Sequence, residues 1–171
     1  MYSKIKKYRE VISISNYKIL EKDAFRFIGF KTKLEGSVNI HAEEFSSQKT
    51  EFFKGIIHDG KMALLQPLSE SKYGYGVVTT DKKTAYYYAG VRTTQKGIAG
   101  TEEVLFSGGK YLVLSDEGGL SRLAFDKLEN QAFNQILTND FEYTYNGKPI
   151  AEVLLNGNPA DAEVEVWIPI E

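Results

Sequence analysis

The last strand-like segment of the sequence combines acidic and aromatic side chains in a regular alternation. Residues 162–170 read AEVEVWIPI, which is the pattern of a β-strand with one purely apolar face. The opposite face carries Glu165 and Trp167. A carboxylate in an apolar cleft seeks a positive partner or becomes protonated, and an aromatic face attracts cations. Together, these side chains are typical of a receptor for a lipophilic cation.

A second segment repeats this alternation in the middle of the chain. Residues 84–92 read TAYYYAGVR, which places Tyr86 and Tyr88 opposite a face of alanine, tyrosine and valine. When the two segments are aligned, Tyr86 falls on Glu165 and Tyr88 falls on Trp167. The purely apolar faces are expected to lie under helices, and the aromatic and acidic faces on the other side of a sheet.

Glu152 is a further acidic candidate. It lies in the preceding strand-like run, residues 150–155, and shares the aromatic face if the hairpin pairs it across from that row. The alternative is that this face is simply the solvated side of a half-exposed sheet. The density of large aromatic side chains favours a binding surface, because contiguous exposed apolar patches usually mark binding sites.

Composition restricts the chemistry further. The chain has 171 residues, which predicts one domain, and its 21 Lys and Arg against 23 Asp and Glu give a net charge of -2. This balance is not that of a nucleic-acid-binding protein, so we expect no direct nucleic-acid binding. The absence of cysteine and the presence of only His41 and His58 exclude a thiolate site, a three-histidine metal site and a cysteine nucleophile. We expect no metal and no cofactor.

Targeting signals are not evident in the sequence. The basic start is not followed by an apolar segment of the kind found in signal peptides, and no apolar run approaches the length of a membrane span. These features predict a cytoplasmic protein without a membrane partner.

The first half of the chain predicts a strand, a helix and a hairpin. Residues 17–35 read as one extended strand, and residues 41–60 have the spacing of apolar side chains on one face of a helix that ends at a glycine. Residues 73–80 and 84–92 are rich in tyrosine, valine and threonine, which predicts two strands joined by a short turn.

The same order then repeats. Residues 103–115 read as a strand with a bulge at its glycine pair, and residues 121–137 keep helical spacing. Residues 150–155 and 162–170 predict a second hairpin around the turn residues Asn-Gly-Asn-Pro.

We therefore expect an α+β fold. It consists of a duplicated strand–helix–strand–strand unit with pseudo-twofold symmetry, and it forms an antiparallel sheet with two helices on one side. Residues 1–16 are assigned to an N-terminal arm and residues 17–171 to a single domain. The two halves of this domain are residues 17–95 and residues 101–171.

The sequence resembles the GyrI-like small-molecule-binding family, which includes the effector-binding domain of multidrug-responsive bacterial transcription activators. The resemblance covers residues 17–171. The matching segments are AFRFIGF at 24–30, YGVV at 75–78, YYYAGV at 86–91, KYLVL at 110–114, KPIAE at 148–152 and EVWIPI at 165–170.

The resemblance implies a ligand cleft between the two halves that is lined by aromatic side chains. A glutamate at the bottom of this cleft meets cationic ligands in the family, and it matches Glu152 by position. Trp167 matches a cleft aromatic on the last strand, and Tyr75 and Tyr88 match tyrosines of the first half. The other candidates are Glu165 as a second acidic residue, Tyr86 on the same face, and Phe27 and Tyr111 as walls from the first strand of each half.

Three functions remain open at this point. The first is binding of hydrophobic, often cationic, aromatic molecules for drug or toxin sensing or sequestration, with Glu152 as the counter-charge. The second is a cofactor-independent hydrolase that adds water to strained electrophiles such as cyclopropane-type natural products, with Glu152 and Glu165 as general acid and base. The third is a protein-interaction or toxin-antagonist role. Only 16 residues precede the domain in this sequence, too few for a helix-turn-helix, so we do not expect direct gene activation. The oligomeric state is not predicted.

Overall fold

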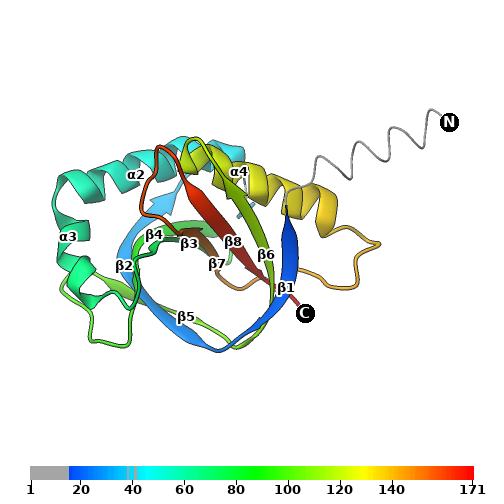
Figure 1. Ribbon diagram of the computed structural model, residues 1–171, viewed down its shortest axis with the longest axis horizontal. Helices are drawn as coiled ribbons and strands as arrows, with labels where there is room; N and C mark the ends of the chain where they lie inside the picture. The colour runs from blue at the N-terminus through cyan, green and yellow to red at the C-terminus, as the bar shows by residue number, and fades with distance from the viewer. Residues whose placement is uncertain (1–15, 38, 41) are drawn as a thin grey trace.

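The computed structural model describes residues 16–37, 39–40 and 42–171. It is an α+β fold with one antiparallel sheet of eight strands, in the order β1-β6-β8-β7-β3-β4-β2-β5. Figure 1 shows this sheet curled beneath its helices. The strands are β1 Tyr17–Lys22, β2 Phe25–Leu34, β3 Gly74–Asp81, β4 Thr84–Arg92, β5 Glu102–Phe106, β6 Gly109–Glu117, β7 Ile150–Leu154 and β8 Glu163–Pro169.

The predicted duplication is visible in the strand order. Read from one edge, the sheet runs β1-β6-β8-β7, and read from the other it runs β5-β2-β4-β3. The outer strand of each set comes from the opposite half of the chain, because β1 pairs with β6 and β5 pairs with β2. The central β3–β7 pair joins the two halves into one continuous sheet.

The single long strands expected at 17–35 and 103–115 are each divided in two. β1 ends at Lys22 and β2 begins at Phe25, because β1 pairs with β6 whereas β2 pairs with β4 and β5 at the other edge of the sheet. Gly108 and Gly109 likewise mark the corner between β5 and β6 rather than a bulge. Gly109 has φ 149°, a conformation that a residue with a Cβ rarely adopts.

The helices lie on one side of the sheet, as Figure 1 shows. They are α2 Ser46–His58, α3 Lys61–Leu65 and α4 Ser121–Gln131, with 3-10 turns at Glu43–Phe45 and Gln66–Leu68 and a π-helical turn at Ala132–Ile136. The two predicted helices are therefore present. The first begins later than expected, and His41 lies outside the described residues. The short α3 was not predicted, because Gly60 reads as a stop and the chain resumes helical geometry directly after it.

The sheet has apolar layers on both faces. The layer under the helices contains the apolar face predicted for β8 together with Tyr87 and Leu128. The concave face of the curled sheet encloses a second, aromatic layer. Its largest members are Phe25, Phe27, Tyr75, Tyr88, Tyr111 and Trp167.

The rings of the aromatic layer pack against one another. The Trp167 ring lies edge-on to Phe25 and Tyr75, with centroids 5.7 and 5.9 Å apart, and Phe27 meets Tyr88 at 6.3 Å. Trp167 is only 4% exposed. The face assignment made from the alternation is therefore correct for β4 and β8, but this face is a buried core and not a solvated surface.

Replacing Trp167 with phenylalanine is expected to lower the free energy of unfolding by about 1–3 kcal/mol. The smaller ring leaves a cavity beside Phe25 and Tyr75, and the hydrogen bond from Trp167 Nε1 to Glu165 is lost. Urea unfolding followed by circular dichroism measures this change. Leu105→Ala, at a side chain that is 64% exposed, serves as a control and is expected to change stability by less than about 0.5 kcal/mol. Equal stabilities of Trp167→Phe and the parent protein would contradict the packing described here.

Candidate functional site

A pocket opens on the helix side of the sheet, between α2 of the first half and α4 of the second. Its volume is about 360 Å³ and its walls are mainly apolar. The floor is formed where β3 meets β7, the central pair of the sheet. The lining residues with apolar or aromatic side chains are Phe53, Ile57, Tyr75, Tyr87, Leu120, Phe125, Leu154, Pro159 and Ala160. The cleft expected between the halves is thus present.

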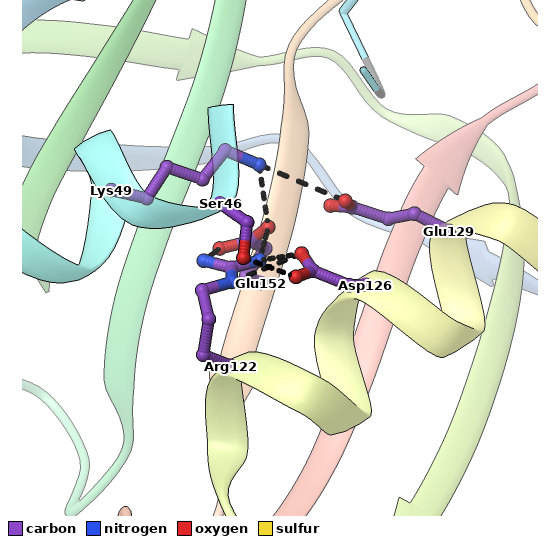
Figure 2. A network of polar contacts seen from close by, with 6 residues as sticks. All are labelled: Ser46, Lys49, Arg122, Asp126, Glu129 and Glu152. Atoms are coloured by element: carbon purple, nitrogen blue, oxygen red, sulfur yellow. Dashed lines mark hydrogen bonds and ion pairs between the residues drawn. The ribbon is translucent and has the colours of Figure 1, made fainter. Parts of the chain in front are cut away.

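A cluster of charged side chains lies at the inner end of this pocket, around Glu152. Arg122 donates from Nη1 to Glu152 Oε1 at 2.9 Å and from Nη2 to Glu152 Oε2 at 2.6 Å. Lys49 Nζ donates to Glu152 Oε2 at 3.0 Å. Figure 2 shows Lys49 entering from α2 and Arg122 from α4, with Glu152 on β7 between them. One carboxylate is therefore paired with a cation from each half of the molecule.

Two further contacts tie the helices together beside this cluster. Asp126, one turn after Arg122, accepts a hydrogen bond from Arg122 Nε at 3.0 Å. It also accepts one from the Ser46 hydroxyl, at the start of α2, at 2.6 Å. These contacts fix the guanidinium group and the separation of the two helices that form the pocket walls (Figure 2).

The two cations determine the ionisation of Glu152. Burial of this fully enclosed side chain would by itself raise its pKa, but Arg122 and Lys49 outweigh burial and hold the pKa of Glu152 well below its usual range. Burial would likewise lower the pKa of Arg122, and the Glu152 carboxylate raises it. The pair is therefore fully charged at neutral pH.

Glu129 is the second buried carboxyl group of the cluster, and its pKa is shifted in the opposite direction from that of Glu152. It lies 3.7 Å from Lys49 Nζ, it is 3% exposed, and its Oε1 has no hydrogen-bond partner among the described residues. Burial, followed by the negative charge of Glu152, raises the pKa of Glu129 well above its ordinary value. Glu129 therefore binds a proton more readily than an exposed glutamate, whereas Glu152 stays ionised.

Tyr87 covers the floor of the pocket, and a glycine makes room for it. Gly76 lies directly opposite Glu152 in the β3–β7 register. A Cβ at this position would approach the Tyr87 hydroxyl oxygen to 2.3 Å. Burial and the nearby Glu152 charge raise the pKa of Tyr87, so its hydroxyl remains protonated.

The structure corrects the expected position of Glu152 relative to Trp167. In the β7–β8 register, Ala151 is opposite Trp167, whereas Glu152 is opposite Val166. Residues directly opposite in an antiparallel pair share a face, so Glu152 points toward the helices and Trp167 into the aromatic layer. Glu165 lies on the Trp167 face, opposite Val153. Glu152 and Glu165 are therefore on opposite sides of the sheet and do not form an acid–base pair.

The remaining predicted site residues divide between the two faces. Glu152 and Tyr75 line the pocket, although the Tyr75 ring packs against Phe27 and Trp167 in the aromatic layer. The other aromatic candidates belong to that layer or pack against it; these are Phe27, Tyr86, Tyr88, Tyr111 and Trp167.

Several residues of the cluster were missed in the sequence. Lys49 had a detectable signal, because it lies four residues after Phe45 and three before Phe52, on the apolar face of the predicted helix. A lysine on such a face needs a buried partner. Arg122 gave no comparable signal, because its partner Glu152 is on a strand whose register the sequence does not specify. Glu129 gave none either, because its contact with Lys49 depends on how α2 and α4 pack.

Comparison with known proteins relates the chain to effector-binding proteins. The sequence model described as "Cass2: Integron-associated effector binding protein" matches residues 18–170. A search of curated proteins gives no match.

Solved structures show the same fold at low sequence identity. SAV2435 bound to tetraphenylphosphonium superposes with a TM-score of 0.71 and 15% identity, over 91% of this chain and 94% of that chain. A putative transcription regulation protein from Staphylococcus aureus MU50 gives a TM-score of 0.66 and 15% identity, over 92% and 99% of the two chains. The integron cassette protein VCH_CASS2 of Vibrio cholerae gives a TM-score of 0.61 and 18% identity, over 91% of this chain and 95% of that chain. The GyrI-like fold inferred from the sequence motifs is confirmed.

Two other kinds of feature are absent from residues 16–37, 39–40 and 42–171. Within these ranges, no helix is long and apolar enough to cross a membrane. The same ranges contain no group of three or more histidine, aspartate or glutamate side chains arranged to hold a metal ion.

The raised pKa of Glu129 predicts a pH-dependent effect of Glu129→Gln. A group whose pKa is raised by folding contributes stability below its unfolded pKa, about 4.5, and this contribution is lost as the pH rises. The glutamine variant does not titrate, so its stability relative to the parent protein is expected to increase with pH above about 4.5. The increase is at most about 1.4 kcal/mol per pH unit.

Urea unfolding at pH 5, 7 and 8 measures this trend. Glu142→Gln, at an exposed glutamate, is the matched control and is expected to show no trend. A stability difference between Glu129→Gln and the parent protein that does not change with pH would show that Glu129 is ionised in the folded state.

Proposed function

Because this chain belongs to the Cass2 family of integron-associated effector-binding proteins, we propose that it binds a small, apolar, aromatic molecule in the pocket between α2 and α4. Its role is the sensing or sequestration of drug-like or toxin-like compounds. The observation that carries this proposal is the pocket itself, which has apolar walls from both halves of the molecule and one charged end.

The pocket has the composition of a small-molecule site. Such sites are concave, mainly hydrophobic and aromatic, and contain a few well-placed polar groups that orient the ligand. Here Phe53 on α2, Phe125 on α4 and Tyr87 on β4 supply the aromatic surface, and the Arg122–Glu152 pair supplies the polar end. The volume of about 360 Å³ is in the range of small-molecule pockets.

The similarity to SAV2435 supports an aromatic ligand class, because that protein was solved with tetraphenylphosphonium, a molecule with four phenyl rings. The fold of the two proteins is shared, and the pocket of this chain offers aromatic rings to such a ligand. We extend only the aromatic, apolar character to this chain, because its carboxylate already has cationic partners.

The hydrolase alternative loses its structural basis, since Glu152 and Glu165 lie on opposite faces of the sheet. Glu129 has a raised pKa, but it cannot take over the role of general acid, because it does not belong to the lining of the pocket. Binding without chemical conversion is the function that this geometry supports best.

A titration with triphenylphosphine oxide, a neutral molecule with three phenyl rings, tests the proposal. We expect saturable one-to-one binding in isothermal titration calorimetry. Phe53→Ala removes a half-buried aromatic wall and is expected to weaken binding about tenfold, equivalent to about 1.4 kcal/mol.

Two variants serve as controls. Phe141→Ala makes the same substitution at a partly exposed phenylalanine outside this pocket, and Trp167→Phe alters the aromatic layer on the other face. Both are expected to bind within about threefold of the parent protein. No saturable binding, or binding that Phe53→Ala leaves unchanged, would refute the assignment of the ligand to this pocket.

A further inference from the structure

We infer that this pocket selects aromatic molecules that carry a neutral hydrogen-bond acceptor or an anionic group, and that it discriminates against cations of the same shape. This inference rests on the proposed function, because it specifies the ligand class of the same pocket. Its basis is that Lys49 and Arg122 already occupy the positions around Glu152 that a ligand cation would take.

The exposure of the charged side chains shows which charge a ligand meets first. The Glu152 side chain is 0% exposed, and that of Lys49 is 2% exposed. The Arg122 side chain is 15% exposed and contacts both oxygens of Glu152. The carboxylate is therefore covered, and Arg122 is the more exposed member of this ion pair.

The aromatic rings of the pocket are also engaged by internal cations. Lys49 Nζ lies 5.7 Å from the centroid of the Tyr87 ring, and the guanidinium carbon of Arg122 lies 5.4 Å from that of Phe125. Both distances are within the range of cation–π attraction. A ligand cation would have to share these rings and Glu152 with two positive charges that are fixed in place.

The charges of the pocket lining support the same ligand preference. Three cationic side chains, Lys49, Lys54 and Arg122, line it together with a single carboxylate, Glu152. Asp126 also pairs with Arg122, but it does not belong to this lining and does not face a bound molecule. The pocket therefore has an excess of positive charge facing a bound molecule, and like charges placed together in an interface are strongly unfavourable.

Glu129 does not offset this excess. Its side chain is 4% exposed, contacts Lys49 and does not belong to the lining of the pocket, so it does not face a bound molecule.

Arg122 supplies the hydrogen-bond donors at the charged end of the pocket. A guanidinium group has five N–H donors, and Nη1 of Arg122 donates to Glu152 Oε1. Arg122 also has a side-chain hydrogen bond with Tyr87. A phosphoryl, carbonyl, phenolate or carboxylate oxygen on an aromatic molecule would therefore meet the guanidinium group and the Tyr87 hydroxyl together.

Two probes of the same shape and opposite charge test this inference directly. Tetraphenylborate and tetraphenylphosphonium are titrated against the full chain by calorimetry in about 0.1 M salt, where charges within the pocket are only partly screened. We expect the borate to bind about tenfold or more tightly than the phosphonium. Triphenylphosphine oxide is expected to bind more tightly than the phosphonium as well.

Substitutions of the lining cations show whether the preference comes from this pocket. Arg122→Gln uncovers Glu152 and is expected to reduce the ratio of borate affinity to phosphonium affinity about tenfold, whereas Arg122→Lys keeps the charge and most of the ratio. Lys54→Met removes an exposed cation at the rim, which does not endanger folding, and is expected to reduce the ratio about threefold. Lys127→Met, at a lysine paired with Asp116 outside the pocket lining, controls for the change in net charge.

The outcomes separate this inference from the proposed function. Tighter binding of the phosphonium by the parent protein, or a ratio that neither Arg122→Gln nor Lys54→Met changes, would overturn the charge preference. If the phosphonium binds more tightly and its binding still depends on Phe53, the proposed function is retained and this inference alone fails. If none of the three probes binds, the proposed function fails.

Discussion

The structure depends on one electrostatic constraint, which is the complete burial of the Glu152 carboxylate at the centre of the sheet. A buried charge without partners costs several kcal/mol, and breaking a buried pair typically costs about 3–5 kcal/mol. The protein meets this constraint with Lys49 from the first half and Arg122 from the second. Because these cations come from α2 and α4, the ion pairs also fix the two helices on either side of the central β3–β7 pair, where the pocket forms.

The duplicated fold explains why such a pocket exists at this place. Each half contributes one long helix to the same face of the sheet, and the halves meet at the β3–β7 pair. The opposite face is closed by the curl of the sheet around its own aromatic layer. The aromatic residues that looked like a ligand surface in the sequence are thus the second core of the protein. The aromatic surface of the pocket comes mainly from Phe53, Tyr87 and Phe125, and Tyr75 is the one predicted aromatic residue that also belongs to its lining.

The sequence was sufficient for the architecture but not for the site. Alternation in β4 and β8 correctly separated Tyr87 and Val166 from Tyr88 and Trp167, because the two faces of a strand follow from its period of two. It could not align β7 with β8, since a shift of one residue in register moves every side chain to the other face. The prediction that Glu152 shares the face of Trp167 depends on this register and is wrong, because Glu152 lies opposite Val166 and points toward the helices. Lys49 is detectable in the sequence by its place on an apolar helix face, but its pairing with Glu152 and the role of Arg122 follow only from that register.

A double-mutant cycle over Arg122 and Glu152 tests the central claim most directly. Arg122→Met, Glu152→Met and the double variant are compared with the parent protein by urea unfolding at pH 7. If the buried carboxylate is neutralised internally by Arg122, the double variant will be more stable than the sum of the single changes allows. The predicted coupling energy is about 2 kcal/mol or more. Additive effects, with a coupling energy below about 0.5 kcal/mol, would contradict the claim that this ion pair organises the site.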